Sequence, residues 1–135
     1  MPILLSSEYY HVEYDAERDL VIIRRSALQM AGPDEAVAAF ELLLRAVHRY
    51  AGRPALLDLR RVAGNNDSRY ESAIKPYLAR LRATFSVTAR VVQTATGRLQ
   101  VQRMARERGD NPGSVFLDEE EALAFLMSTQ GRAGR

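Results

Sequence analysis

The chain has 135 residues, the length of one domain, and its 47% hydrophobic and 27% charged residues are typical of a globular protein. It contains no cysteine and two histidines, which excludes disulfides, thiolate catalysis and metal sites made of sulfur or of several imidazoles. We therefore expect neither a metal nor another cofactor. The apolar run at the start lacks a basic flank and is too short for a signal peptide. No stretch approaches the roughly 20 apolar residues of a membrane span, so we expect a cytoplasmic protein.

The first predicted elements are two strands, Tyr9–Asp15 and Leu20–Arg25, joined as a hairpin. Alternation divides the first strand into two faces, one with Tyr10, Val12 and Tyr14 and the other with Tyr9, His11 and Glu13. Both faces of this expected edge strand carry aromatic rings. Because such an edge needs cover, we expect a second copy of the chain to pair with it as a homodimer.

A helix is predicted next, with Pro33 in its first turn and Asp34 as a candidate cap. Gly52 is expected to end it, and Pro54 prevents its continuation. Apolar residues at helical spacing form the expected buried stripe, namely Val37, Phe40, Leu44, Val47 and Ala51.

The remaining predicted elements alternate between strands and helices. They are a strand at Ala55–Leu59, a helix opening at Ser68, a strand at Ser86–Thr94, a helix at Gly97–Arg108, a strand at Val115–Leu117 and a helix at Asp118–Met127. Pro76 predicts either a bend in its helix or a regular part that starts near the proline. The last helix begins with Asp118 and Glu121 at capping-box spacing.

The order β-β-α-β-α-β-α-β-α predicts an α/β protein with a single mixed, largely parallel sheet and helices packed on it. We expect one domain over residues 1–127 and a flexible tail over residues 128–135.

Two segments carry a resemblance to a known family. ALLDLRRV, residues 55–62, resembles the central strand of the STAS domain, with Asp58 in the usual leucine–aspartate–leucine context. VFLDEEEALAFL, residues 115–126, resembles the closing strand and helix of the wider SpoIIAA-like group. The resemblance implies the STAS fold over nearly the whole chain and a non-enzymatic, regulatory role in protein–protein binding, as in anti-sigma factor antagonists.

In the antagonist branch, the loop after the central strand carries aspartate–serine–serine–glycine, and a partner kinase phosphorylates the first serine. The nearest equivalent here begins Asp67-Ser68, but the second serine and the glycine are missing. Ser68 is therefore a candidate phosphorylation site by position alone. The alternative is a helix cap, because Glu71 follows it at capping-box spacing.

The loop after the central strand is also the predicted partner-binding surface, because ligands meet α/β sheets at the carboxyl ends of their strands. Its expected contact residues are Arg60, Arg61, Gly64, Asn65, Asn66, Asp67, Ser68 and Arg69. The glycine and asparagines equally suit a simple turn.

A second polar surface is predicted on the basic helix, where four side chains lie close to one face, namely Arg98, Gln102, Arg103 and Arg106. Such a face binds phosphate groups or an acidic protein, or is simply solvated. The absence of a recognition motif and of aromatic residues among these arginines argues against nucleic acid.

Two further functions stay open. A small apolar or lipidic ligand would occupy a cavity beside the helix that contains Pro76, lined by Tyr70, Tyr77, Leu81 and Phe85. A cavity there favours the ligand, whereas tight packing of the helix favours a protein partner. An enzyme would need His11 or His48 beside a carboxylate in a cleft, with His11 and Glu13 as the candidate pair; His48 is expected at the partly buried boundary of its helix.

Overall fold

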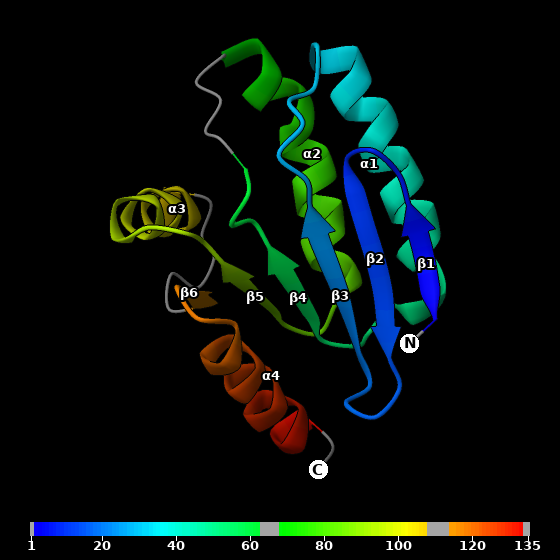
Figure 1. Cartoon of the computed structure of the whole chain (residues 1–135), viewed down its shortest axis with the longest axis vertical. Coiled ribbons are helices and arrows are strands. Elements are labelled where there is room, and N and C mark those ends of the chain that lie inside the picture. The colour runs from blue at the N-terminus through cyan, green and yellow to red at the C-terminus, as the bar shows by residue number, and fades with distance from the viewer. Residues whose placement is uncertain (1, 63–67, 108–113, 134–135) are drawn as a thin grey trace.

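The computed structural model describes residues 2–62, 68–107 and 114–133, with the backbone alone at Ser68 and 129–133. Within these ranges the chain forms one mixed sheet of six strands and four α-helices (Figure 1). The strands are β1 Ile3–Ser6, β2 Tyr10–Asp15, β3 Leu20–Arg25, β4 Ala55–Asp58, β5 Thr88–Val91 and β6 Val115–Phe116. The helices are α1 Pro33–Val47, α2 Ser68–Thr84, α3 Ala95–Glu107 and α4 Glu119–Ala133, with a 3₁₀ turn at His48–Tyr50.

The six strands lie in the sheet in the order in which they occur along the chain. The pairs β1–β2 and β2–β3 are antiparallel, whereas β3–β4, β4–β5 and β5–β6 are parallel. The carboxyl ends of β3, β4 and β5 therefore meet at one edge. The predicted α/β class with a mixed, largely parallel sheet is confirmed.

The strand β1 was not predicted, and it changes the expected edge of the sheet. Leu5 is paired with Val12 and Ser6 with His11, so β2 is internal. The premise of an exposed edge at β2, which motivated homodimerisation through that strand, is wrong. β1 has four residues, too few for the alternation that reveals a half-buried strand.

Tyr9 also lies elsewhere than expected. It precedes β2, is buried, and joins the same core as Tyr10 instead of facing away from it. Its ring no longer gives β2 a second aromatic face.

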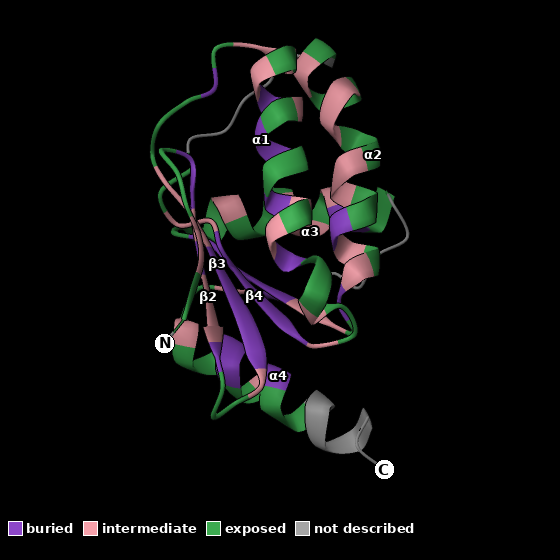
Figure 2. Cartoon of the chain, turned by 90° about the vertical axis from the view of Figure 1, so that its right-hand side faces the viewer, coloured by how far each residue is buried: buried purple, intermediate pink, exposed green. Residues whose placement is uncertain are grey.

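The sheet separates two apolar cores. One core lies between the sheet and the helices α1 and α2, where strand residues such as Val21, Ile23 and Leu57 belong to the same cluster as Phe40 and Leu81. The other is formed by α4, with a core of Leu20, Ile22, Leu56, Ala89, Val91, Ala122, Leu123 and Leu126. α1 and α2 lie side by side, and α4 lies apart from them (Figure 2).

The helix α1 begins at Pro33, as expected, but its N-cap is Gly32 and no side chain caps it. Asp34 lies inside the first turn, so its predicted role as cap is wrong. The residues buried on this helix are Ala36, Ala39, Phe40, Leu43 and Val47. Of the predicted stripe, Phe40 and Val47 are confirmed, Val37 and Leu44 are half-buried, and Ala51 lies exposed beyond the helix end. The helix ends at Val47 with His48 as its C-cap, so the predicted end at Gly52 is wrong. Gly52 follows the 3₁₀ turn and has φ +85°, a left-handed conformation that favours glycine.

Three later boundaries differ from the sequence-based ones. α2 runs through Pro76, so a regular part starting near the proline is wrong. α3 begins two residues before the predicted Gly97, because the Thr94 side chain caps it: the Gly97 amide donates to Thr94 Oγ1 at 3.0 Å. α4 continues to Ala133, past the predicted end at Met127, and the Glu120 amide donates to Asp118 Oδ1 at 3.3 Å.

Candidate functional site

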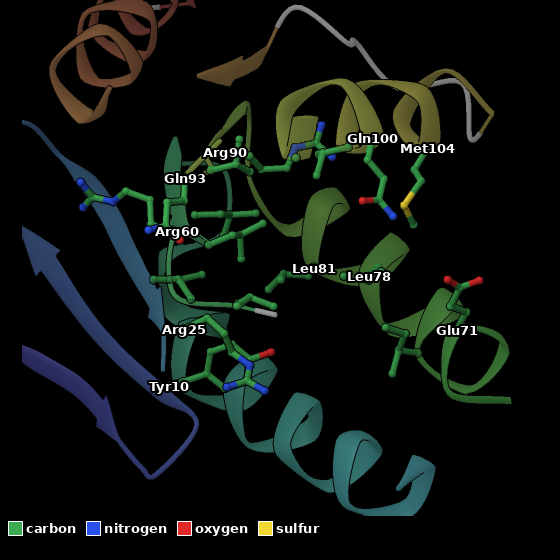
Figure 3. Close-up of a pocket in the computed structure, with 18 of the residues that line it drawn as sticks. Tyr10, Arg25, Arg60, Glu71, Leu78, Leu81, Arg90, Gln93, Gln100 and Met104 are labelled. Atoms are coloured by element: carbon green, nitrogen blue, oxygen red, sulfur yellow. The ribbon is translucent and has the colours of Figure 1, made fainter. Parts of the chain in front are cut away.

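A cavity of about 550 Å³ lies over the carboxyl ends of β3, β4 and β5, between the sheet and the helices α2 and α3 (Figure 3). This edge is where α/β sheets commonly hold their ligands. The volume is within the range of small-molecule sites, roughly 300–1,000 Å³.

Most of the lining is apolar and comes from four sides. The sheet contributes Ile23, Leu57, Leu59 and Val92; α2 contributes Ile74, Leu78 and Leu81; α3 contributes Val101 and Met104; and Tyr10, Met30 and Phe40 close the α1 side.

The cavity exists because α2 and α3 do not bury their apolar faces. On α2, Leu81 is buried, whereas Ile74 and Leu78 are only half-buried and face the cavity. On α3, Ala105 is the only buried residue among those described. The amphipathic pattern of both helices is therefore satisfied only in part by the protein itself.

The polar part of the lining is basic. Among the described residues, the charged side chains of the lining are Arg25, Arg60, Arg82 and Arg90 with one carboxylate, that of Glu71. Arg90 is 5% exposed and donates from Nη2 to Ser114 Oγ at 3.2 Å. Alternation places it on the cavity face of β5, because its neighbours Ala89 and Val91 pack under α4.

Arg25 occupies the β3 side of the cavity, next to Tyr10 (Figure 3), and it also lies close to the ring of Tyr9. Its guanidinium carbon lies 5.3 Å from the ring centre of Tyr9 and 5.6 Å from that of Tyr10, and Nη1 donates to Ser26 O at 2.8 Å. Burial raises the pKa of Tyr10 to about 12, an effect that Arg25 partly offsets. Tyr10 is therefore a neutral phenol at ordinary pH.

A cluster of four charged residues lies beside the cavity, and Asp58 is at its centre. Asp58 Oδ2 accepts from Arg24 Nη1 at 2.7 Å, and Asp58 Oδ1 accepts from Arg60 Nε at 2.9 Å. Glu119 Oε1 accepts from the same two arginines, at 2.7 Å from Arg24 and 2.9 Å from Arg60. We call these four residues the ion-pair cluster.

The ion-pair cluster determines the charge of Asp58. Burial alone would raise the pKa of this carboxyl, but the hydrogen bonds from Arg60 and Arg24 outweigh it and hold the pKa at about 2. The same guanidinium of Arg24 lowers the pKa of Glu119. Asp58, predicted from the family resemblance, is thus a structural anion that ties β4 to β3 and to the start of α4.

The predicted partner-binding loop is described only at its two ends. Arg60 belongs to the ion-pair cluster, whereas Arg61, Val62 and Arg69 are exposed. The other predicted contact residues, Gly64, Asn65, Asn66 and Asp67, and the side chain of Ser68 lie outside the described residues.

The predicted basic face lies on α3. Arg98, Arg103 and Arg106 are exposed and Gln102 is half-buried. None of the four lines the cavity, which α3 meets with Gln100, Val101 and Met104.

Half of the predicted ligand-pocket residues line the cavity. Tyr70 and Leu81 do, whereas Tyr77 packs against Phe40 with ring centres 6.2 Å apart and Phe85 is buried in the core. No local pattern points to the contributions of β5 and α3 to the cavity, because those depend on the order of the strands in the sheet.

The histidines lie away from the cavity. His11 Nε2 and Glu13 Oε1 are 2.7 Å apart, but the alternation of β2 places them on the face opposite Tyr10, which lines the cavity. His48 is exposed in the 3₁₀ turn, so the expected partly buried position is wrong. In the described ranges there is no group of three or more histidine, cysteine or acidic residues that would suit a metal ion.

Comparison of the chain with protein-family models, with curated proteins and with solved structures gives no match. None of the helices in the described part of the chain combines the length and apolarity needed to cross a bilayer.

Proposed function

We propose that this protein is a non-enzymatic binding module for a small, largely apolar ligand, which occupies the cavity between the sheet, α2 and α3. The observation that carries the proposal is the lining: apolar side chains from three elements converge there, and two helices leave their apolar faces half-buried toward it. The cavity opens to solvent through exposed residues such as Glu71, Gln93 and Gln100, so a ligand bound there would remove its apolar side chains from water.

We further propose that the fold is a STAS-like variant with the additional strand β1. The support is the pattern of the central strand with Asp58 and of the closing strand and helix after Val115. In this proposal the binding module has a regulatory role, in which ligand occupancy alters what the protein contacts.

A protein partner at the loop after β4 is a second candidate. One observation favours it. Val62 lines the cavity, and 41% of its surface is also exposed to solvent at the start of that loop, next to exposed Arg61. A bound ligand would touch the same residue that a partner meets.

The ligand proposal is tested with n-decanol as an apolar probe, measured by thermal shift and by native mass spectrometry. A ligand present at about 100 times its Kd stabilises the native state by about 2.7 kcal/mol, a rise of several degrees in Tm. Leu78→Trp, which fills the cavity from α2, should abolish the shift. Leu42→Trp is the matched control, because Leu42 is exposed on α1 and does not line the cavity.

Circular dichroism confirms that each variant is folded before binding is compared. An unchanged Tm with decanol in the wild type, or equal binding by Leu78→Trp and the wild type, would overturn the proposal.

A further inference from the structure

We propose that the ligand of this cavity is an amphipathic monocarboxylate and that Arg25 binds its carboxylate. The inference rests on the proposed function and names the class of ligand. It has three supports: the direction in which Arg25 lies, the partners that Arg25 lacks, and the charge of the lining.

The position of Arg25 follows from the strand itself. Ile23 lines the cavity, and residues two apart on a strand lie on the same face, so Arg25 is also directed to the cavity side of β3. The next strand continues that face with Leu57 and Leu59. An apolar body lying over these leucines therefore has a guanidinium at its β3 end (Figure 3).

Arg25 differs from its neighbour in its partners. Arg24, on the other face of β3, pairs with Asp58 and Glu119. No carboxylate among the described residues lies within 4.0 Å of Arg25: its Nη1 donates to Ser26 O and Oγ, and its other polar partner is the neutral Tyr10 phenol. A guanidinium has five N–H donors, and its planar fork matches a carboxylate.

Two other arginines of the lining, Arg60 and Arg90, suit the head group less well. Arg60 is engaged by Asp58 and Glu119. Arg90 is almost fully buried, so a carboxylate brought to it would lose most of its hydration. Arg25 is half-buried, where a carboxylate keeps part of its water and gains charge-assisted hydrogen bonds.

The charge of the lining excludes a cationic head group. In the described part of the chain, four arginines and one glutamate line the cavity, so a carboxylate complements it and an ammonium does not. The rings of Tyr9 and Tyr10 hold the Arg25 guanidinium in place, which reduces the entropy lost when it binds a carboxylate.

The test compares decanoate with decanol, which share a chain and differ in the head group, by isothermal titration calorimetry at pH 7 and below micelle concentrations. The wild type should bind decanoate roughly tenfold more tightly than decanol. Arg25→Met should lose this preference and still bind decanol. Arg25→Lys, which keeps the charge, should keep part of the preference. Arg98→Met, an exposed arginine of α3 outside the cavity, should behave as wild type.

The outcomes separate the two proposals. Decanol binding without any preference for decanoate, or an unchanged preference in folded Arg25→Met, overturns the inference and leaves the proposed function standing. Binding of neither probe by the wild type overturns both. If Arg25→Met binds neither decanoate nor decanol and Arg25→Lys still binds both, then Arg25 maintains the cavity as a whole. That result overturns its role in binding the head group.

Discussion

Arg24 and Asp58 occupy paired positions on the parallel strands β3 and β4, and Arg24 Nη1 donates to Asp58 Oδ2 at 2.7 Å. The same nitrogen donates to Glu119 Oε1 at 2.7 Å, at the first residue of α4. This one guanidinium therefore joins two central strands to the helix that covers the opposite face from the cavity. The carboxyl ends of β3 and β4 are held in place by a structural ion pair, beside the site where a ligand is proposed.

We expect Asp58→Asn to lower the free energy of unfolding by about 2 kcal/mol, because it leaves the two arginines with Glu119 as the one carboxylate of the ion-pair cluster and replaces charged hydrogen bonds with neutral ones. The estimate is kept small because Arg24 and Arg60 are partly exposed and solvent screens their charges. Urea unfolding measures the change. Glu17→Gln, at an exposed carboxylate without a described ion pair, is the control, and equal stability of the two variants would contradict the expectation.

The cost of Asp58→Asn should depend on pH. The pKa of Asp58 is lowered from 3.8 to about 2 in the folded protein, so its ionised form stabilises the fold above the unfolded pKa. That contribution is lost as the pH falls toward the folded value. We expect the difference in unfolding free energy between wild type and variant to be full above about pH 5 and to shrink toward pH 2, by up to about 2 kcal/mol. Urea midpoints measured at several pH values test this, and a difference that does not change with pH would refute the assigned pKa.

The sequence predicts local features of this fold better than its contacts. The strands β2 to β4, the start of α1 at Pro33 and the left-handed backbone of Gly52 follow from spacing and from the conformational limits of proline and glycine. The family resemblance of residues 55–62 points to Asp58 but not to the residues that pair with it. Arg24 and Glu119 lie 95 residues apart, and no periodicity links them. Only the register of β3 with β4 and the return of α4 bring them together.

The sequence predicts only those residues of the cavity that belong to a local apolar pattern. Tyr70 and Leu81 lie on the apolar face of α2, which the sequence shows directly. From the sequence, Arg25 is the last residue of a predicted strand, and Met104 lies in the predicted basic helix. Both line the cavity because of the strand order and because α3 buries few of its side chains against the rest of the protein. Neither feature follows from a local sequence pattern.

Asp19 gives a prediction about the β2–β3 turn. It has φ +53°, and its Oδ1 accepts from Tyr14 Oη and from Arg53 Nε, the latter at 2.8 Å. Asn tolerates this left-handed conformation and keeps an acceptor, whereas Ala does neither. We expect Asp19→Ala to lose about 1–2 kcal/mol of stability and Asp19→Asn less than half of that. Urea unfolding of the two variants tests this, and equal losses would show that neither the conformation nor the acceptor matters.

Substitution of Thr94 tests how weakly α3 is held over the cavity. Its hydroxyl caps the helix through the Gly97 amide, and its carbonyl accepts from the Arg98 amide at 2.8 Å. Because α3 buries little apolar surface, loss of the cap should loosen this helix more than the rest of the protein. We expect Thr94→Ala to cost about 1 kcal/mol and to speed hydrogen exchange of α3 amides while those of β4 stay protected. Thr96→Ala, one position inside the helix, is the control that should change neither. Slower exchange in α3 when decanol is added would place the ligand against this helix, and exchange that rises equally in α3 and β4 would contradict the expectation of a separately opening α3.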